Sequence, residues 1–314
     1  MVLRILKEIA GAGVSVNTVL AQPGITPGGT LAGEVRFTGG DVDLEVQRIE
    51  LDLAAGVLRA QRESERLVPT GFFQAQVCGP FRLAAGGSHA IPFTVTIPWE
   101  TPLTAMGGRP ITGMELGVAT ELALSRAFDK TDHDALTVEP LPVQAEALRA
   151  IEAAGFQLQG GKLVDGTYPG SHMPFYQEIE FWSTGEFTAH FKKLSVTFFT
   201  GAETTEVVFQ ADNLGTLLTP GVDVSQRFTV RNNVPSDFTE LVRQQLWELV
   251  KRRTPGNLSK IHNPLPGRSA TSDLHSPSIR AFRRMFRRKK NGVAHLSQFA
   301  LFLYSEGENT TPHP

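Results

Sequence analysis

A cluster of potential metal ligands lies near the middle of the chain, in Asp129, Asp132, His133 and Asp134. Carboxylate oxygens and an imidazole nitrogen can together bind a divalent cation. The cluster has neither the glycine nor the distal glutamate of a calcium-binding loop. We therefore predict that these residues form a hinge between two domains, where their carboxylates accept hydrogen bonds from nearby backbone amides. A metal site is the alternative.

A second candidate is a glycine pair followed by lysine, Gly160, Gly161 and Lys162, which resembles the end of a phosphate-binding loop. Phe156 stands where such a loop has its first glycine, and Leu163 replaces the Ser or Thr that would bind Mg²⁺. The backbone cradle for a phosphate and the hydroxyl for the cation are therefore both missing. A turn between two strands is the better interpretation.

Motifs for nucleophilic, zinc and dinucleotide chemistry are absent from the sequence. It contains neither Gly-x-Ser-x-Gly nor His-Glu-x-x-His, and Gly11 and Gly13 lack the third glycine of a dinucleotide-binding fingerprint. The single cysteine, Cys78, has no neighbouring residue that would activate its thiol. We therefore expect neither a cofactor nor catalytic activity.

The composition indicates two strand-rich domains. The chain has 314 residues, and a domain typically has roughly 100–200. Its 30 glycines and 20 prolines favour many turns and short strands over long helices. A lone cysteine excludes an intramolecular disulfide and fits a reducing cytoplasm. Arg4, Lys7 and Glu8 interrupt the apolar run that a secretion signal requires, so we expect a cytoplasmic protein.

Alternation of apolar and polar residues predicts the strands of both domains. Ile49, Leu51 and Leu53 face one way while the charged residues between them face the other, as in a half-buried antiparallel strand. The other predicted strands cover residues 14–20, 31–37, 93–97, 118–124, 178–182, 194–199, 207–212 and 228–230. Short strands separated by turn residues are typical of a β-sandwich.

Three short helices accompany these strands, at residues 2–10, 143–154 and 237–252. The last helix can begin with a capping box of Asp237 and Glu240. Its predicted apolar face contains Phe238, Leu241, Val242, Leu246 and Leu249, with Trp247 at the margin. The predicted fold is therefore mainly all-β. A β-sandwich over residues 1–128 is followed by a hinge over 129–142, a second sandwich with its helix over 143–253, and a largely disordered basic tail over 254–314.

The net charge of −2 hides a strong asymmetry between body and tail. Residues 251–290 contain 12 Lys and Arg and a single acid, so they carry +11. Residues 1–250 contain 18 basic and 29 acidic residues, so they carry −11. An acidic body with a basic tail indicates that the tail contacts something acidic.

The basic tail contains an amphipathic segment at residues 278–290. In a helical projection, one side is apolar and the neighbouring side is rich in arginine. The candidate contact residues are Ile279, Arg280, Phe282, Arg283, Arg284, Phe286, Arg287 and Arg288. This pattern predicts peripheral contact with an acidic membrane at its cytoplasmic face. Two alternatives remain: the segment binds nucleic acid, or the tail folds back on the acidic body.

Four segments, in their order and spacing, resemble the bacterial sporulation-control proteins of the stage-zero M type, an arrestin-like family. They are residues 27–35 (PGGTLAGEV), 39–46 (GGDVDLEV), 132–134 (DHD) and 169–181 (PGSHMPFYQEIEF). The resemblance covers about residues 1–250. It implies two arrestin-like β-sandwiches in tandem, a cytoplasmic location and a regulatory part in sporulation or a related developmental programme. It brings no catalytic residues, so binding of regulatory protein partners is the expected activity.

Overall fold

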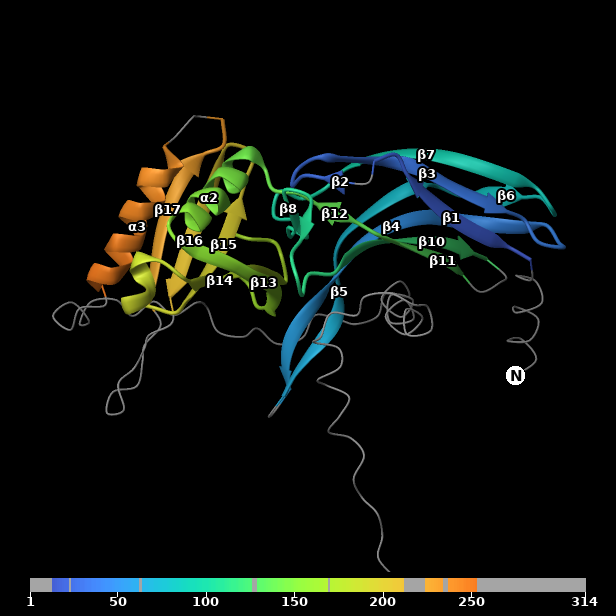
Figure 1. Cartoon of the computed structure of the whole chain (residues 1–314). Coiled ribbons are helices and arrows are strands. Elements are labelled where there is room, and N and C mark those ends of the chain that lie inside the picture. The colour runs from blue at the N-terminus through green and yellow to red at the C-terminus, as the bar shows by residue number, and fades with distance from the viewer. Residues whose placement is uncertain are drawn as a thin grey trace, which may run out of the picture.

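The structure is a computed structural model that describes residues 13–22, 24–61, 64–125, 129–168, 170–211, 224–233 and 237–252. The helix predicted at residues 2–10 and the basic tail lie outside the described residues. The described chain forms two strand-rich halves that share one continuous sheet (Figure 1). The predicted mainly-β fold with a few short helices is confirmed.

The first half is a sandwich of two antiparallel sheets around a common core. One sheet has the strand order β1-β3-β7, and the other has the order β11-β10-β4, with β5 and β6 also paired to β4. Val35, Phe37, Leu51 and Leu122 belong to the shared core. The strands are β1 (Ser15–Leu20), β3 (Thr30–Thr38), β4 (Leu44–Gln61), β5 (Ser64–Cys78), β6 (Phe81–Leu83), β7 (Ser88–Thr96), β10 (Leu116–Leu124) and β11 (Lys130–Ala135). Short pairs join β2 (Gly24–Ile25) to β12 (Thr137–Val138) and β8 (Ala105–Met106) to β9 (Arg109–Pro110).

The second half is a five-stranded antiparallel sheet with two helices on one side (Figure 1). Its elements are α2 (Pro142–Ala153), β13 (Phe156–Asp165), β14 (Phe175–Ser183), the 3₁₀ helix η1 (Glu186–Ala189), β15 (Lys193–Thr200), β16 (Thr204–Ala211), β17 (Val224–Arg231) and α3 (Phe238–Arg252). Where a second sheet was expected over this one, the described residues place α2 and α3. The helices pack against each other, and α3 also contacts β16 and β17.

The helix α3 forms as its sequence pattern predicts. Asp237 accepts a hydrogen bond from the Glu240 amide at 3.2 Å and so satisfies one of the free amides of the first turn. Its buried side is formed by Phe238, Val242, Leu246 and Leu249. Burial of such side chains contributes roughly 1.5–3 kcal/mol each, which is enough to hold the helix on the sheet.

The hinge predicted for residues 129–142 is wrong for most of its length. Residues 130–135 form β11, which pairs antiparallel with β10 over its whole length, and residues 137–138 form β12. Only residues 139–141 connect the first half directly to α2. An edge strand can carry polar side chains on both faces, so this stretch lacks the alternation by which the other strands were predicted.

The glycine pair of β13 is a contact point between the halves and not a turn. The strand has a bulge between Leu158 and Gly160. The Gly161 amide donates a hydrogen bond to the Thr112 carbonyl at 2.8 Å. A Cβ atom on Gly160 would lie 2.6 Å from the same carbonyl oxygen, so a side chain there would prevent this approach of the two backbones.

Candidate functional site

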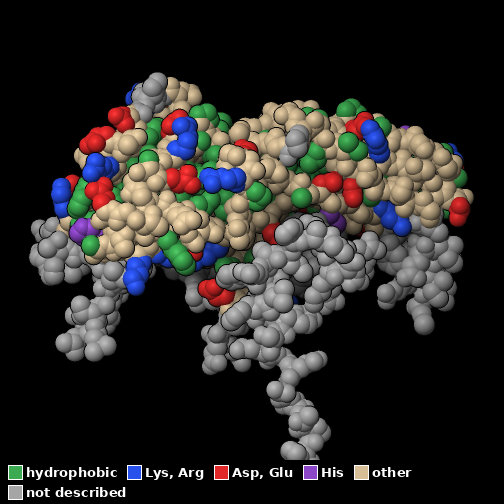
Figure 2. Space-filling view, viewed as in Figure 1, with side chains coloured by type: hydrophobic (Ala, Val, Ile, Leu, Met, Phe, Trp, Pro, Cys, Tyr) green, Lys and Arg blue, Asp and Glu red, His purple; other side chains and the backbone are tan. Residues whose placement is uncertain are grey.

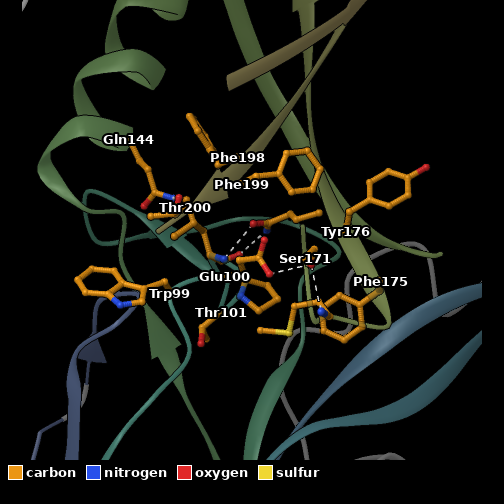
Figure 3. Close-up of a pocket in the computed structure, with 14 residues that line it drawn as sticks. Trp99, Glu100, Thr101, Gln144, Ser171, Phe175, Tyr176, Phe198, Phe199 and Thr200 are labelled. Carbon is orange, nitrogen blue, oxygen red and sulfur yellow. Dashed lines mark hydrogen bonds between the residues drawn. The ribbon is translucent and has the colours of Figure 1, made fainter. Parts of the chain in front are cut away.

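A recess lies where the loop after β7 meets the second half of the molecule (Figure 3). One wall is the loop at residues 99–103. The other walls are the start of α2, the loop before β14, and the facing ends of β14 and β15. The lining residues are Trp99, Glu100, Thr101, Pro102, Leu103, Gln144, Ser171, Met173, Phe175, Tyr176, Gln177, Phe198, Phe199 and Thr200.

Hydrogen bonds between the two halves hold the walls of the recess together. The Gln177 side chain accepts a hydrogen bond from the Leu103 amide at 2.9 Å and donates one to the Leu103 carbonyl at 2.7 Å. The Ser171 hydroxyl donates to the Glu100 carboxylate at 2.7 Å and accepts from the Met173 amide at 3.0 Å (Figure 3). Because one side chain satisfies both backbone groups of Leu103, the loop and β14 have a fixed relative position.

Trp99 stands at the rim of the recess with 37% of its surface exposed. Its ring packs directly on the backbone of Gly28, where a Cβ atom would come within 2.3 Å of the ring. Gly28 also has a φ of +69°, a conformation that glycine adopts without strain. The indole is therefore held in place by a residue of the turn at 27–29.

The size of the recess limits what it can bind. Its cavity volume is about 20 Å³. That volume accommodates about one water molecule, whereas pockets for organic ligands measure about 300–1,000 Å³. The enclosed part of the recess is therefore far smaller than an ordinary pocket for an organic ligand.

The predicted hinge residues do not converge on one point. Asp129 accepts a hydrogen bond from the Leu124 amide at 3.0 Å, so it caps a nearby amide as expected. Asp132 accepts one from the Thr18 amide of β1 at 2.5 Å, which connects the two sheets of the sandwich. His133 lies between Asp132 and Asp134 in β11, and neighbouring strand residues point to opposite faces.

This alternation separates the side chains that a metal site at these residues would need to bring together. Within the described ranges, no group of three or more His, Cys, Asp or Glu residues is placed to hold a metal ion. Asp132 is already used as an acceptor for β1, and the imidazole of His133 faces the opposite side of the sheet. The cluster that looked compact in the sequence is therefore divided by the strand geometry.

Burial changes the ionisation of several of these groups. It raises the pKa of Asp134 to about 6, with a further contribution from Asp132. Burial also lowers the pKa of His133, although the negative charge of Asp132 acts in the opposite direction. On the outer face of the same sheet, burial and then the charge of Asp129 raise the pKa of Glu121 to about 7. Sequence analysis missed Glu121, because a charged residue between apolar ones in a strand is normally exposed to solvent.

The eight candidate residues for contact with an anionic surface, Ile279 to Arg288, lie outside the described residues, so their predicted contact remains a prediction. In the part of the chain that the structure describes, no helix is both long enough and apolar enough to cross a membrane.

Sequence analysis did not single out the recess as a site, although two of its parts lie in segments quoted for the family resemblance. Gly28, beneath Trp99, belongs to residues 27–35, and Ser171 and Gln177 belong to residues 169–181. These segments are far apart in the sequence, and only the folded chain brings them to one place. The sequence therefore marked these residues only as part of the family resemblance, because they form no chemical motif.

Comparisons with known proteins agree on one family. A family model described as SpoOM protein matches residues 3–215. The sporulation-control protein spo0M of Bacillus subtilis (strain 168) is 30% identical over 209 residues, which cover 66% of this chain and 79% of that protein. The crystal structure of Spo0M, the sporulation control protein from Bacillus subtilis, matches with a TM-score of 0.64 and 27% identity, covering 77% of this chain and 99% of that chain.

Proposed function

Because this chain belongs to the SpoOM family of sporulation-control proteins, we propose that it regulates sporulation, or a related developmental programme, by binding other proteins in the cytoplasm and not by catalysis. The expected arrestin-like β-sandwich fold is confirmed by the match to the Spo0M crystal structure. Such a fold offers sheet edges, sheet faces and the groove between its halves as binding surfaces.

The observation that carries this proposal is the fixed recess between the two halves, with Trp99 at its rim. A partly exposed tryptophan beside a small depression is typical of the residues that contribute most to protein interfaces. Packing on Gly28 has already restricted the indole, so binding would cost less side-chain entropy. Glu100 adds a carboxylate to the lining, which favours a partner segment with a basic or hydrogen-bond-donating side chain.

One face of the molecule has a mixed surface, which supports binding through a few anchor residues and not through a broad apolar interface. Figure 2 shows basic and acidic side chains interspersed over this face of the molecule, with hydrophobic side chains scattered among them. A mixed surface of this kind is usual for proteins that bind partners transiently, where a few anchor residues supply most of the affinity.

The test is complementation in the organism from which the chain comes. Deletion of the gene should change the frequency of sporulation, or of the corresponding developmental step, and the wild-type gene should restore it. Trp99→Ala should fail to restore it although the protein accumulates normally. Trp182→Ala is the matched control, because Trp182 is 58% exposed and lies away from the recess.

A photo-crosslinking amino acid placed at position 99, and separately at position 182, gives a second measurement. A discrete adduct with another protein should form from position 99 and not from position 182. The proposal fails if deletion leaves development unchanged. Full complementation by Trp99→Ala would instead reject the recess as the binding site.

A further inference from the structure

One residue of the connection between β13 and β14 contacts three adjacent strands of the second half. The ring of Tyr168 stacks on the ring of Phe199 of β15, with 3.6 Å between the ring centroids and an interplanar angle of 13°. Its hydroxyl donates a hydrogen bond to the Glu206 carboxylate of β16 at 3.0 Å and accepts one from the Arg227 guanidinium of β17. This guanidinium carbon lies 4.9 Å from the centre of the tyrosine ring. Stacking, a cation–π contact and hydrogen bonds therefore hold one side chain in place.

A short turn connects Tyr168 to the wall of the recess. The Ser171 amide donates a hydrogen bond to the Tyr168 carbonyl at 2.9 Å, as in a β-turn. Gly170, within this turn, has a φ of +89°, which glycine adopts without strain. The Ser171 hydroxyl is the group that donates to Glu100 of the first half. One end of the turn is therefore fixed on the second half and the other end on the first half.

The other described residues of this connection are held by its own hydrogen bonds. The Gly166 amide donates to the Pro174 carbonyl at 3.2 Å, which closes the base of the loop. The Met173 amide donates to the Ser171 hydroxyl at 3.0 Å. We call the described residues 166–168 and 170–174 the strap. Because these bonds are internal, a displacement of Tyr168 displaces Ser171 and Met173, which both line the recess.

Phe199 gives a second connection between Tyr168 and the recess. It lines the recess (Figure 3) and also stacks on the tyrosine ring. Loss of that ring would remove a stacking partner from Phe199 and allow it other rotamers. Tyr168 itself is 8% exposed and does not line the recess. Its effect on the recess therefore passes through Phe199 and the strap.

We infer that Tyr168 is a positioning residue for the recess. Its contacts with β15, β16 and β17 hold the strap where Ser171 meets Glu100, and they keep Phe199 in the wall. The recess retains its shape only while Tyr168 makes these contacts. The effect on partner binding rests on the function proposed above, whereas the effect on the shape of the recess does not.

Hydrogen–deuterium exchange of the full chain, measured by NMR, tests this role without a partner. In Tyr168→Ala, the amides of Gly166, Ser171 and Met173 should exchange at least about tenfold faster than in the wild type, because the strap opens locally without its aromatic contact. Exchange in β3, the central strand of its sheet in the first half, should not change. A general loss of stability would accelerate both. Tyr168→Phe keeps the stacked ring and should restore most of the protection.

Two arginines of β17 form a matched pair for the same measurement. Arg227→Ala removes the guanidinium next to the tyrosine ring and should accelerate exchange of the strap several-fold. Arg231→Ala removes the same side chain from an exposed position four residues along the same strand, on the same face. Exchange of the strap should stay at the wild-type rate in this control.

The photo-crosslinking amino acid at position 99 measures the consequence for binding. The yield of the protein adduct should fall several-fold when Tyr168→Ala is added, because the wall of the recess is no longer held in place. It should persist with Tyr168→Phe and with Arg231→Ala.

Three outcomes would overturn the role of Tyr168. One is unchanged exchange of the strap in Tyr168→Ala, and another is an equal acceleration in β3. The third is an undiminished adduct from position 99 in a variant whose strap exchanges fast. If the wild type forms no adduct at all, the proposed function fails, and the exchange of the strap still decides whether Tyr168 holds it.

Discussion

Asp132 connects the two sheets of the first half through a single side chain. It lies on β11, and its carboxylate accepts a hydrogen bond from the amide of Thr18 on β1 at 2.5 Å. The Thr18 hydroxyl lies 2.6 Å from the Thr120 hydroxyl in the buried space beside it. Polar groups therefore close this edge of the sandwich, where the sequence suggested a flexible hinge.

Replacing Asp132 should reveal this contact. Asp132→Ala leaves the buried Thr18 amide without its acceptor, so we expect a loss of about 1–3 kcal/mol in the free energy of unfolding. Asp132→Asn keeps an acceptor oxygen and should lose much less. Chemical denaturation of both variants provides the measurement. Equal losses in the two would show that the negative charge, and not the hydrogen bond, matters.

Glu121 should make the stability of the protein depend on pH. Burial and the neighbouring carboxylates raise its pKa from 4.5 to about 7, so the folded state holds this proton more tightly than the unfolded state. The folded state is then favoured most below pH 4.5, and this advantage is lost as pH rises from about 4.5 to about 7. Above that range, ionised Glu121 carries a constant cost of at most about 3 kcal/mol.

The variant Glu121→Gln tests this effect. It should raise the melting temperature relative to the wild type at pH 8, where the wild-type carboxylate is ionised. The difference should shrink towards pH 5, because the wild-type group is then protonated and equally neutral. Thermal melts across this range measure it. A constant difference at all pH values would show that the carboxyl group does not titrate in this range.

Among the elements, β13 depends on its bulge to meet the first half. The backbone of Gly160 approaches the Thr112 carbonyl so closely that a Cβ atom would lie 2.6 Å from the oxygen. Gly160→Ala should therefore destabilise the protein by about 1–3 kcal/mol, as expected for an overpacked contact. Gly71→Ala on β5 is the control, since a Cβ atom there meets nothing closer than 4.0 Å.

Thermal denaturation compares the two alanine variants. The control should remain within about 0.5 kcal/mol of the wild type, as is usual for uncrowded positions. If both variants unfold at the wild-type temperature, the contact between β13 and the loop at residue 112 is not needed for stability.

At the scale of the whole molecule, the two halves are joined by contacts of several kinds. β13 continues the sheet of β4, where Leu58 pairs with Val164, and the hydrophobic core runs through both halves. Arg59 on β4 also donates a hydrogen bond to Asp165 at 3.0 Å. These contacts favour unfolding of the described body as one cooperative unit.

Gln177 is the place to test this coupling. Gln177→Ala leaves the amide and the carbonyl of Leu103 without their partner, so the halves should lose cooperativity and unfold in two transitions. Gln157→Ala, an exposed position on β13, should keep the single transition of the wild type. Differential scanning calorimetry distinguishes the two patterns. Two transitions already present in the wild type would contradict the rigid junction.

The sequence by itself determined the strand-rich class, most strands, α2, α3 and the family. Alternation and amphipathic spacing are local properties, so they are readable from neighbouring residues, as in Ile49, Leu51 and Leu53. Strands without that signal were missed. β5 contains Pro69 and Gly71, which usually interrupt a strand and here lie near a bulge in its pairing with β4. β11 is polar on both faces because it lies at an edge.

Only the tertiary structure decided where the proposed binding recess lies. The recess joins Gly28, Trp99 and Gln177, which are distant in sequence and come together only when the two halves pack. Glu50 and Glu121, which are distant in sequence, are directly opposite each other because of the strand register. Strand geometry also separated Asp132 from His133, although they are neighbours in the chain. Spacing along the sequence cannot reveal these arrangements, because they depend on which strands pair and in what register.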